Sequence, residues 1–361
     1  MVCERLRFEN NFKLIKRLNP KLPKAEIEKR IKAIEWDLSL KPYSAEVTVN
    51  TTCNNRCLFC YNDPKLLNHN QNISFEKICK VLYIGKKQGC WIASIIGGEP
   101  TLREDIFKIS EFARKLGYEC IKLCTNGRRL SDIKYAKRLI DAGFNSFDIS
   151  LHSSKSNIHD TLVGRKGAFK ETMKAMENIK ELGAELATAI VLNKLNYKDF
   201  VNFFNLTYNK LQINYFNIIA ANSSGAMRIN KELLCEISDL AVEIRRGLKI
   251  AEAYGFPFFT RILINFPPCL LPEYLNIIAD WETNQKVDEV VLIPEEKISD
   301  MKTILRNRSA KIKGICGKCI LNERCRGFNI EYIDQIDIKK INPIKKIPKQ
   351  KFKTTFTYEF I

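Results

Sequence analysis

Residues 45–62 read AEVTVNTTCNNRCLFCYN, a valine-rich run followed at once by a loop with three cysteines. The run predicts a β-strand. The loop has C-x3-C-x2-C spacing, with which three thiolates can bind three corners of one [4Fe–4S] cube. The fourth iron would then lack a protein ligand, and an open coordination position is typical of a reactive metal site. The alternative is a structural zinc site, for which His69 is available as a fourth ligand.

Short apolar runs alternate with amphipathic helices after this loop. The expected strands cover residues 45–50, 91–96, 120–124, 146–151, 186–192 and 215–220. The expected helices cover residues 75–88 after the cap Ser74, 104–116, 132–142 after the cap Ser131, and 168–182. Such repetition predicts parallel strands joined by right-handed crossovers. Because the unusual residues follow the strands, as in barrel enzymes, we expect an α/β fold with a partial (β/α)6 TIM barrel rather than a doubly wound sheet.

The chain is expected to divide into four regions. Residues 1–44 form an N-terminal helical extension with a helix over 24–36, and residues 45–225 form the partial barrel. Residues 226–338 contain a helix over 231–254 and a small C-terminal cysteine-rich domain. Residues 339–361 form a basic tail with seven lysines and one acid, which we expect to be solvated or loosely packed.

The cysteine loop closely resembles the cluster loop of the radical S-adenosylmethionine (SAM) superfamily, including the aromatic Phe59 directly before the third cysteine. The resemblance implies that Cys53, Cys57 and Cys60 bind a [4Fe–4S] cluster whose open iron takes the amino and carboxylate groups of SAM. Reductive cleavage of SAM would then give methionine and a 5′-deoxyadenosyl radical that abstracts hydrogen from a substrate. Phe59 would lie against the adenine.

Further residues at the strand ends are implied by the same resemblance. Gly97-Gly98-Glu99-Pro100 looks like the family's motif for the methionine amine, in which glycines allow close approach to a ligand and Glu99 accepts a hydrogen bond from the ammonium group. His152 is implied to bind SAM, but it could instead bind substrate or transfer a proton. His159 is expected at the surface. The other implied SAM-binding residues are Thr125, Asn126, Ser150, His152, Val191 and Asn193.

A second cysteine group reads Cys316-x2-Cys319-x5-Cys325, and Cys269 is a distant fourth thiol. It resembles the auxiliary-cluster regions of SPASM/twitch-type radical enzymes that modify peptides, and this resemblance implies one auxiliary [4Fe–4S] cluster. A zinc knuckle with four thiolates is the alternative. The remaining cysteines are expected to be buried packing thiols, namely Cys3, Cys79, Cys90, Cys120, Cys124 and Cys235.

Composition favours a cytoplasmic protein with no membrane partner. The 361 residues include 13 cysteines, the N-terminus does not resemble a signal peptide, and prolines interrupt the most apolar region at 262–279. Reducing compartments leave thiols available as metal ligands. The formal charge of +18 comes from 59 Lys and Arg against 41 Asp and Glu, and it allows a polyanionic partner.

Three functions follow from these patterns. The first is a radical SAM enzyme that matures a ribosomally made peptide or a protein, with flavodoxin or ferredoxin as electron donor. The second is radical modification of RNA or of a nucleotide-derived small molecule, which the positive charge favours. Interleaved basic and aromatic residues, typical of a nucleic-acid stacking platform, are lacking. The third is a non-enzymatic zinc scaffold.

Overall fold

The computed structural model describes residues 23, 44–62, 72–213, 215–253, 262–279, 281, 289–292, 298–300, 309–330, 333 and 336–352. The helical extension expected over residues 1–44 lies almost entirely outside these ranges, as do His69 and Cys3.

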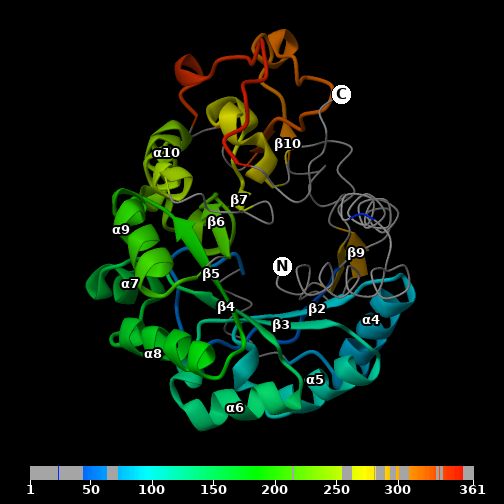
Figure 1. The fold of residues 1–361 in the computed structure, drawn as a ribbon. Helices are drawn as coiled ribbons and strands as arrows, with labels where there is room; N and C mark the ends of the chain where they lie inside the picture. Colours follow the sequence, from blue (N-terminus) through cyan, green and yellow to red (C-terminus); the bar gives the residue numbers. More distant parts are fainter. Residues whose placement is uncertain are drawn as a thin grey trace.

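A nine-stranded sheet forms the centre of the molecule, in the order β7-β6-β5-β4-β3-β2-β1-β8-β9. Neighbours from β7 to β8 pair in parallel, and β9 pairs antiparallel with β8. The sheet curls into a half-barrel, which confirms the expected partial TIM barrel (Figure 1). β7, β8 and β9 extend it beyond the six expected strands. The strands are β1 (Ser44–Thr48), β2 (Ile92–Ile96), β3 (Cys120–Thr125), β4 (Ser146–Ser150), β5 (Glu185–Leu192), β6 (Phe216–Ala220), β7 (Leu263–Ile264), β8 (Glu289–Leu292) and β9 (Ile298–Asp300).

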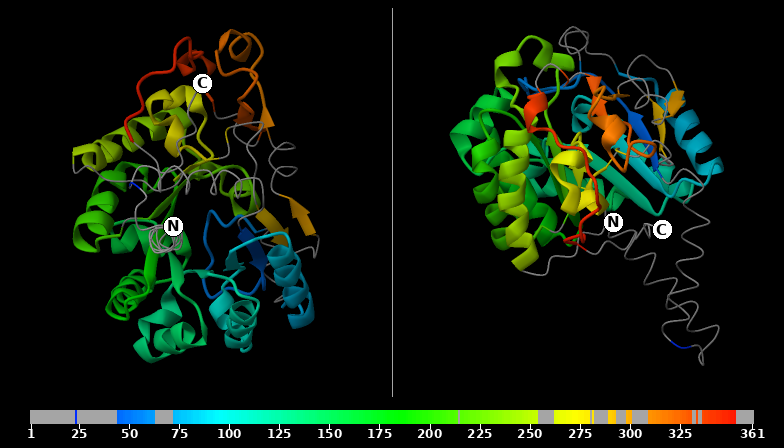
Figure 2. Two further views of the ribbon diagram at one scale, coloured as in Figure 1. Left: turned by 45° about the vertical axis from the view of Figure 1, so that its right-hand side comes forward. Right: turned by 90° about the horizontal axis from the view of Figure 1, so that it is seen from above.

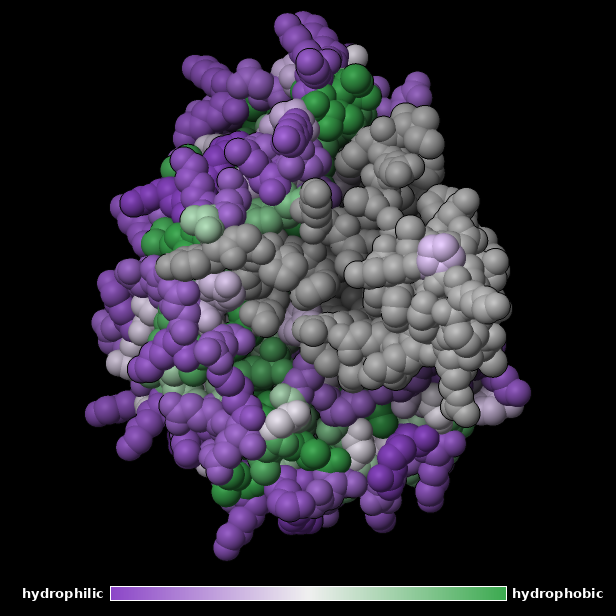
Figure 3. Space-filling model, viewed as in Figure 1, coloured by the Kyte–Doolittle hydropathy of each residue, from purple (hydrophilic) through white to green (hydrophobic). Residues whose placement is uncertain are grey.

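Helices cover the outer face of the half-barrel (Figure 1). Their amphipathic sequences turn apolar residues inward, while hydrophilic side chains cover the helices on the outside (Figure 3). The helices are α4 (Phe75–Lys87), α5 (Ile106–Lys115), α6 (Ile133–Ala142), α7 (Ser156–Val163), α8 (Ala168–Glu181), α9 (Phe200–Phe204) and α10 (Ile237–Ala253). Short 3-10 or π turns are η1 (Pro100–Leu102), η2 (Arg128–Ser131), η3 (Tyr197–Asp199), η4 (Asn205–Lys210), η5 (Gly225–Arg228), η6 (Lys231–Leu233), η7 (Pro268–Leu270), η8 (Pro272–Ile277), η9 (Cys316–Lys318) and η11 (Ile338–Lys340).

Three helix starts differ from the sequence prediction, the simplest being α5, which begins at Ile106 and not at residue 104. Ser74 caps α4 as expected, but α6 is capped by Asp132, whose carboxylate accepts a 2.9 Å hydrogen bond from the Lys134 N–H, and not by Ser131. The expected helix over 231–254 is also wrong at its start, because the chain is extended at Leu234 and α10 begins at Ile237. At this break the Leu234 side chain packs in an apolar cluster beside the cysteine loop.

The C-terminal segment packs against the barrel. Its lysines are exposed, but Ile341, Ile344 and Phe352 are buried, and the Gln350 amide donates a 3.0 Å hydrogen bond to the Pro272 carbonyl. Both views in Figure 2 place this segment beside the chain around η7 and η8. The prediction of a loosely packed tail is therefore wrong for residues 339–352, because apolar residues between the lysines are buried in the core. Upstream, β10 (Ser309–Ala310) pairs antiparallel with β11 (Phe328–Asn329).

Candidate active site

A cavity of about 530 Å³ lies where the parallel strands end. Chain segments far apart in sequence meet there, because the carboxyl ends of parallel strands share one edge of the sheet. In the described lining, the cavity brings together most of the residues that the sequence singled out. These are Cys53, Cys57, Phe59, Cys60, Gly97, Gly98, Thr125, Asn126, Ser150, His152 and Val191.

The cysteine loop is held by its backbone on one side of the cavity. The Arg56 and Leu58 N–H groups each donate a 2.9 Å hydrogen bond to carbonyls at the end of α7, those of Val163 and Leu162. Gly164 follows with a positive φ of 63°, and a Cβ there would lie 2.7 Å from the Arg56 carbonyl oxygen. α7 therefore ends in a glycine that lets the loop lie directly on the helix end.

A second segment holds the loop after its third cysteine. The Ala226 N–H donates a 2.8 Å hydrogen bond to the Cys60 carbonyl, and the Asn230 amide donates to the Leu58 carbonyl at 2.9 Å. A Cβ on Gly225 would lie 2.1 Å from the Cys60 carbonyl oxygen. The loop that carries the three cysteines is thus held at both ends by hydrogen bonds to its main chain.

The donor set of the loop fits an iron–sulfur cluster. Burial, then the charge of Glu99, raises the pKa of Cys53 to about 11, and burial, then Cys60 and Cys53, raises the pKa of Cys57 well above 9. The Asn55 N–H also points at the Cys53 sulfur at 3.4 Å, as is common around cluster thiolates. Adjacent buried thiolates repel one another unless a cation lies among them. In the described part of the chain, no three His, Cys, Asp or Glu side chains converge on a position where one metal ion could bind. A [4Fe–4S] cube does not need such convergence, because each thiolate binds a different iron.

Glu99 is fully buried, and its carboxylate is used by the protein's own donors. It accepts hydrogen bonds from the hydroxyls of Thr101 and Thr125 at 2.6 and 2.7 Å and from the Asn126 N–H at 2.8 Å. It also caps η1, which begins at Pro100. The side chain therefore joins the loops after β2 and β3, and neither it nor Pro100 is part of the described cavity lining.

Gly97 and Gly98 do line the cavity, but their lack of a side chain serves a chain crossing. A Cβ on Gly97 would lie 2.4 Å from the Asn50 side-chain oxygen, and one on Gly98 would lie 2.3 Å from the Thr52 carbonyl oxygen. The Gly98 N–H donates to the Asn50 carbonyl at 2.8 Å, and the Glu99 N–H donates to the Thr52 carbonyl at 2.7 Å. The glycines thus let this motif lie against the start of the cysteine loop.

His152 is buried in the cavity wall with a defined tautomer. Its Nδ1 accepts a 3.3 Å hydrogen bond from the Val191 N–H, so the neutral ring carries its proton on Nε2. Burial, then the neighbouring His159, lowers the pKa of His152 well below 6.5. The Phe59 ring meets it edge-on, with centroids 4.5 Å apart. A neutral imidazole with Nδ1 engaged can donate a hydrogen bond from Nε2 but cannot accept a proton easily.

His159 is buried, so its expected surface position is wrong. It is 1% exposed, its ring stacks on His152 with centroids 5.8 Å apart, and its Nδ1 accepts a 3.1 Å hydrogen bond from the His152 N–H. It shares the inner face of α7 with Leu162 and Val163, three and four residues later. His159 therefore holds the backbone of a cavity residue.

This burial predicts a pH-dependent stability. Burial lowers the pKa of His159 from 6.5 to about 4. Between these two pH values the imidazole binds a proton in the unfolded chain but not in the folded chain. Stability should fall as the pH drops from 6.5 towards 4, by about 2 kcal/mol at pH 5 from this group alone. In urea unfolding of the cluster-free protein, His159→Gln should reduce the difference in unfolding free energy between pH 7.5 and 5 by that amount. An unchanged difference would contradict the assignment.

Two residues, Cys124 and Asn193, have positions relative to the cavity that differ from the sequence expectation. Cys124 was expected to be a packing thiol, but it lines the cavity, and burial raises its pKa to about 12. Asn193 is buried and outside the described lining, where its side chain bonds the Val191 carbonyl and the Leu195 N–H. Of the other expected packing thiols, Cys79 is only half-buried. Cys90, Cys120 and Cys235 are buried as expected.

Several lining residues had no signal in the sequence analysis. Their side chains are acidic, phenolic, hydroxyl or amide groups. An acid inside an otherwise apolar strand is the sequence signal that could have identified Glu46. These residues are Glu46, Asn55, Tyr61, Asn222, Ser224, Asn265 and Asn329.

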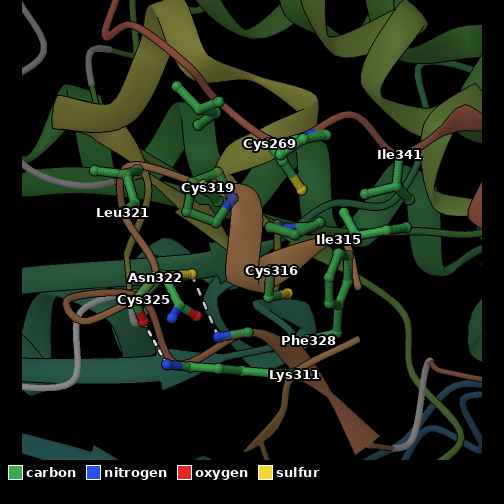
Figure 4. Close-up of a pocket in the computed structure, with 15 residues that line it drawn as sticks. Cys269, Lys311, Ile315, Cys316, Cys319, Leu321, Asn322, Cys325, Phe328 and Ile341 are labelled. Atoms are coloured by element: carbon green, nitrogen blue, oxygen red, sulfur yellow. Dashed lines mark hydrogen bonds between the residues drawn. The ribbon is translucent and has the colours of Figure 1, made fainter. Parts of the chain in front are cut away.

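A second pocket, of about 30 Å³, is lined by Cys269, Cys316, Cys319 and Cys325 (Figure 4). Cys269 comes from η7, and the other three lie between β10 and β11, with Cys316 in η9. Burial, then the nearby Cys325 and Cys316, raises the pKa of Cys269 to about 12. The Ile312 N–H points at the Cys316 sulfur at 3.3 Å. Four thiols that line one pocket, with an N–H directed at one of the sulfurs, could bind the corners of a second cluster, and a four-thiolate zinc site is the alternative.

A half-barrel with a thiol-lined cavity at the carboxyl ends of its strands has the architecture of barrel enzymes. Residues 47–207 match the family model of the radical SAM superfamily. The matched region is 161 of the 361 residues and contains the three-cysteine loop and the Gly97–Pro100 motif, and members of this superfamily are enzymes that use a [4Fe–4S] cluster and SAM.

The related sequences have different named activities. The chain is 29% identical over 209 residues to the Fe-coproporphyrin III synthase of Methanosarcina barkeri, covering 57% of this chain and 51% of that protein. It is 29% identical over 180 residues to a probable GTP 3′,8-cyclase of Saccharolobus solfataricus, covering 50% and 57%. The chain thus spans little more than half the length of these relatives.

Solved structures share the fold over most of the chain. SuiB of Streptococcus suis has a TM-score of 0.58 and 15% identity, covering 94% of this chain and 87% of SuiB. The enzyme anSMEcpe with bound AdoMet and Kp18Cys peptide has a TM-score of 0.59 and 18% identity, covering 84% and 93%. In the described part of the chain, no helix combines the length and hydropathy needed to cross a bilayer.

Proposed function

We propose that this chain is a radical SAM enzyme that modifies a peptide or protein and uses a second, auxiliary [4Fe–4S] cluster. When bound, the first cluster and SAM supply a 5′-deoxyadenosyl radical that abstracts a hydrogen atom. In this proposal Cys53, Cys57 and Cys60 hold that cluster, and the walls of the cavity position SAM and exclude water. Neutral His152 offers a hydrogen bond from Nε2.

The observation that carries the proposal is a pocket lined by four cysteines directly beside the large cavity. Phe328 lines the four-cysteine pocket and its neighbour Asn329 lines the large cavity, so β11 forms part of the wall of both. Similarly, Asn265 lines the large cavity, and Cys269, four residues later, lines the four-cysteine pocket. A cluster bound here would lie next to a substrate in the cavity, where it could accept the electron left on an oxidised substrate.

The cavity lining favours a peptide over an anionic substrate. The described lining contains no Lys or Arg, whereas phosphates and carboxylates are usually bound by such cations. It contains five asparagines, whose amides both donate to and accept from peptide groups. SuiB has been solved with its precursor peptide SuiA, and anSMEcpe with a peptide.

The main alternative is radical chemistry on RNA or a nucleotide, which the charge of +18 and the relatives named GTP 3′,8-cyclase favour. It predicts tRNA binding whose log K falls steeply with log salt. We also place the enzyme in the cytoplasm, where reduced thiols and a flavodoxin or ferredoxin donor are available. The zinc scaffold predicts a colourless protein that contains zinc and no iron.

Reconstitution tests the proposal. The anaerobically reconstituted chain should be brown, contain about eight irons and acid-labile sulfides from two cubes, and release 5′-deoxyadenosine when SAM and dithionite are added. A colourless zinc protein would support the scaffold instead.

Cys269→Ala should remove the second cluster only. Iron should fall from about eight to about four atoms per chain, because the second cube loses one of the four thiolates proposed to bind it. Release of 5′-deoxyadenosine should persist, while peptide oxidation should fail. The matched control is Cys79→Ala, a half-buried thiol on α4. Full iron in Cys269→Ala would show that this thiol is not a ligand.

A further inference from the structure

The part of the cysteine loop between its first two cysteines is bound by residues that follow β3. The Arg128 guanidinium donates from Nη1 to the Asn54 carbonyl oxygen at 2.8 Å and to the Asn55 side-chain oxygen at 3.2 Å. The Asn126 amide donates a 2.7 Å hydrogen bond to the Asn54 side-chain oxygen. Residues after β3 therefore hold the loop in addition to α7 and η5.

The Arg128 side chain is itself held in place by the barrel. It is 10% exposed, and its Nε forms an ion pair with Glu171 of α8. The Arg128 N–H also donates a 3.0 Å hydrogen bond to the Asn126 side-chain oxygen. A guanidinium carries several N–H donors in a rigid planar fork, so one side chain can bind an acid and a carbonyl at the same time. Arg128 therefore links the cysteine loop to α8.

One peptide group of the loop lies between Arg128 and Cys53. Its carbonyl, which belongs to Asn54, accepts the hydrogen bond from Arg128. Its N–H, which belongs to Asn55, points at the Cys53 sulfur at 3.4 Å. The C=O and N–H of a planar trans peptide point in opposite directions and turn together. The bond from Arg128 to the carbonyl therefore fixes the direction in which this N–H points.

We propose that Arg128 is a positioning residue for the first cluster, because it holds the peptide between residues 54 and 55 so that its N–H donates to the Cys53 sulfur. This inference rests on the proposed function for the role of Cys53 as a cluster ligand. Hydrogen bonds to the sulfurs are among the features that set the reduction potential of a cluster. They stabilise the reduced form, which carries one more negative charge. Arg128 thus makes the first cluster easier to reduce.

Redox titration of the reconstituted full-length protein tests this role. Arg128→Met removes the donors and keeps a long side chain, and it is made together with Cys269→Ala so that the first cluster gives the signal. The one-electron reduction equilibrium should shift about tenfold towards the oxidised cluster, near the lower end for a hydrogen bond to a charged group. That shift equals a midpoint potential about 59 mV lower. Arg128→Lys, a milder change that keeps the charge and one donor nitrogen, should lower the potential by less.

Hydrogen–deuterium exchange of the full-length, cluster-free chain is the second measurement. In Arg128→Met the peptide that covers residues 53–60 should exchange about tenfold faster, because the loop has lost its bond to the residues after β3 and opens more often. The matched control is Arg165→Met, which makes the same change at an exposed residue just after α7. It should leave both the exchange rate and the midpoint potential at the values of the unsubstituted chain.

An unchanged potential in Arg128→Met would overturn the inference. A lower potential with unchanged exchange of the loop would also overturn it, because the guanidinium would then act through its charge alone. The exchange measurement separates this inference from the proposed function. If the unsubstituted chain bound no cluster but Arg128→Met still exchanged faster in the loop, the proposed function would be contradicted and the positioning of the loop by Arg128 would be supported.

Discussion

Cys57→Ala is expected to reduce the release of 5′-deoxyadenosine from SAM to the level seen without enzyme. The change removes one of three proposed cluster ligands. The hydrogen bonds that position the loop come from the main chain of Arg56 and Leu58 and remain in the variant. The fold should therefore persist while the first cluster is lost. Anaerobic incubation with dithionite, followed by chromatography of the nucleosides, measures this result.

Cys79→Ala is the control for this experiment too, because it removes a half-buried thiol of α4 outside the described cavity lining. It should release 5′-deoxyadenosine at the wild-type rate. More than about a tenth of that rate in Cys57→Ala would contradict the role of this cysteine, since loss of a cluster ligand removes the chemistry rather than slowing it.

Gly98→Ala is expected to destabilise the protein by about 3 kcal/mol, near the upper end of what overpacking costs. The new methyl group would lie 2.3 Å from the Thr52 carbonyl oxygen and 2.5 Å from that of Thr51. Both are backbone atoms at the start of the cysteine loop, and the Thr52 oxygen accepts the hydrogen bond from the Glu99 N–H, so making room for the methyl group would shift this loop. Urea unfolding and release of 5′-deoxyadenosine should both report the damage.

The same substitution at Gly317 supplies the comparison, because a Cβ there meets nothing within 4 Å and its φ is not positive. Gly317→Ala should change the unfolding free energy by less than about 0.5 kcal/mol, as is usual for surface sites. If Gly98→Ala were equally mild, the chain crossing could not be the reason for this glycine.

The parts of the molecule that the sequence predicted correctly are those with local signals. Apolar runs identified six strands, and the spacing of the first three cysteines identified the loop that lines the cavity. Cys269 was also grouped correctly with Cys316, Cys319 and Cys325 in one pocket, although 47 residues separate it from the next of them.

The features that were missed depend on packing between distant segments. His159 looks like a surface residue on a short helix, but α7 turns it against His152. Glu99 is predicted to bind a ligand, and the sequence did not show that it also accepts hydrogen bonds from Thr101, Thr125 and Asn126. The inward direction of Cys124 and Glu46 follows from strand alternation once the register is known, and sequence alone does not give the register.

The most direct test of the account is the electron paramagnetic resonance spectrum of the reduced protein with and without SAM. Cys269→Ala isolates the signal of the first cluster. If three cysteines hold that cluster and leave one iron open, adding SAM must shift its g values, because the amino and carboxylate groups bind that iron. A reduced, fully loaded cluster whose spectrum does not respond to SAM would contradict the account.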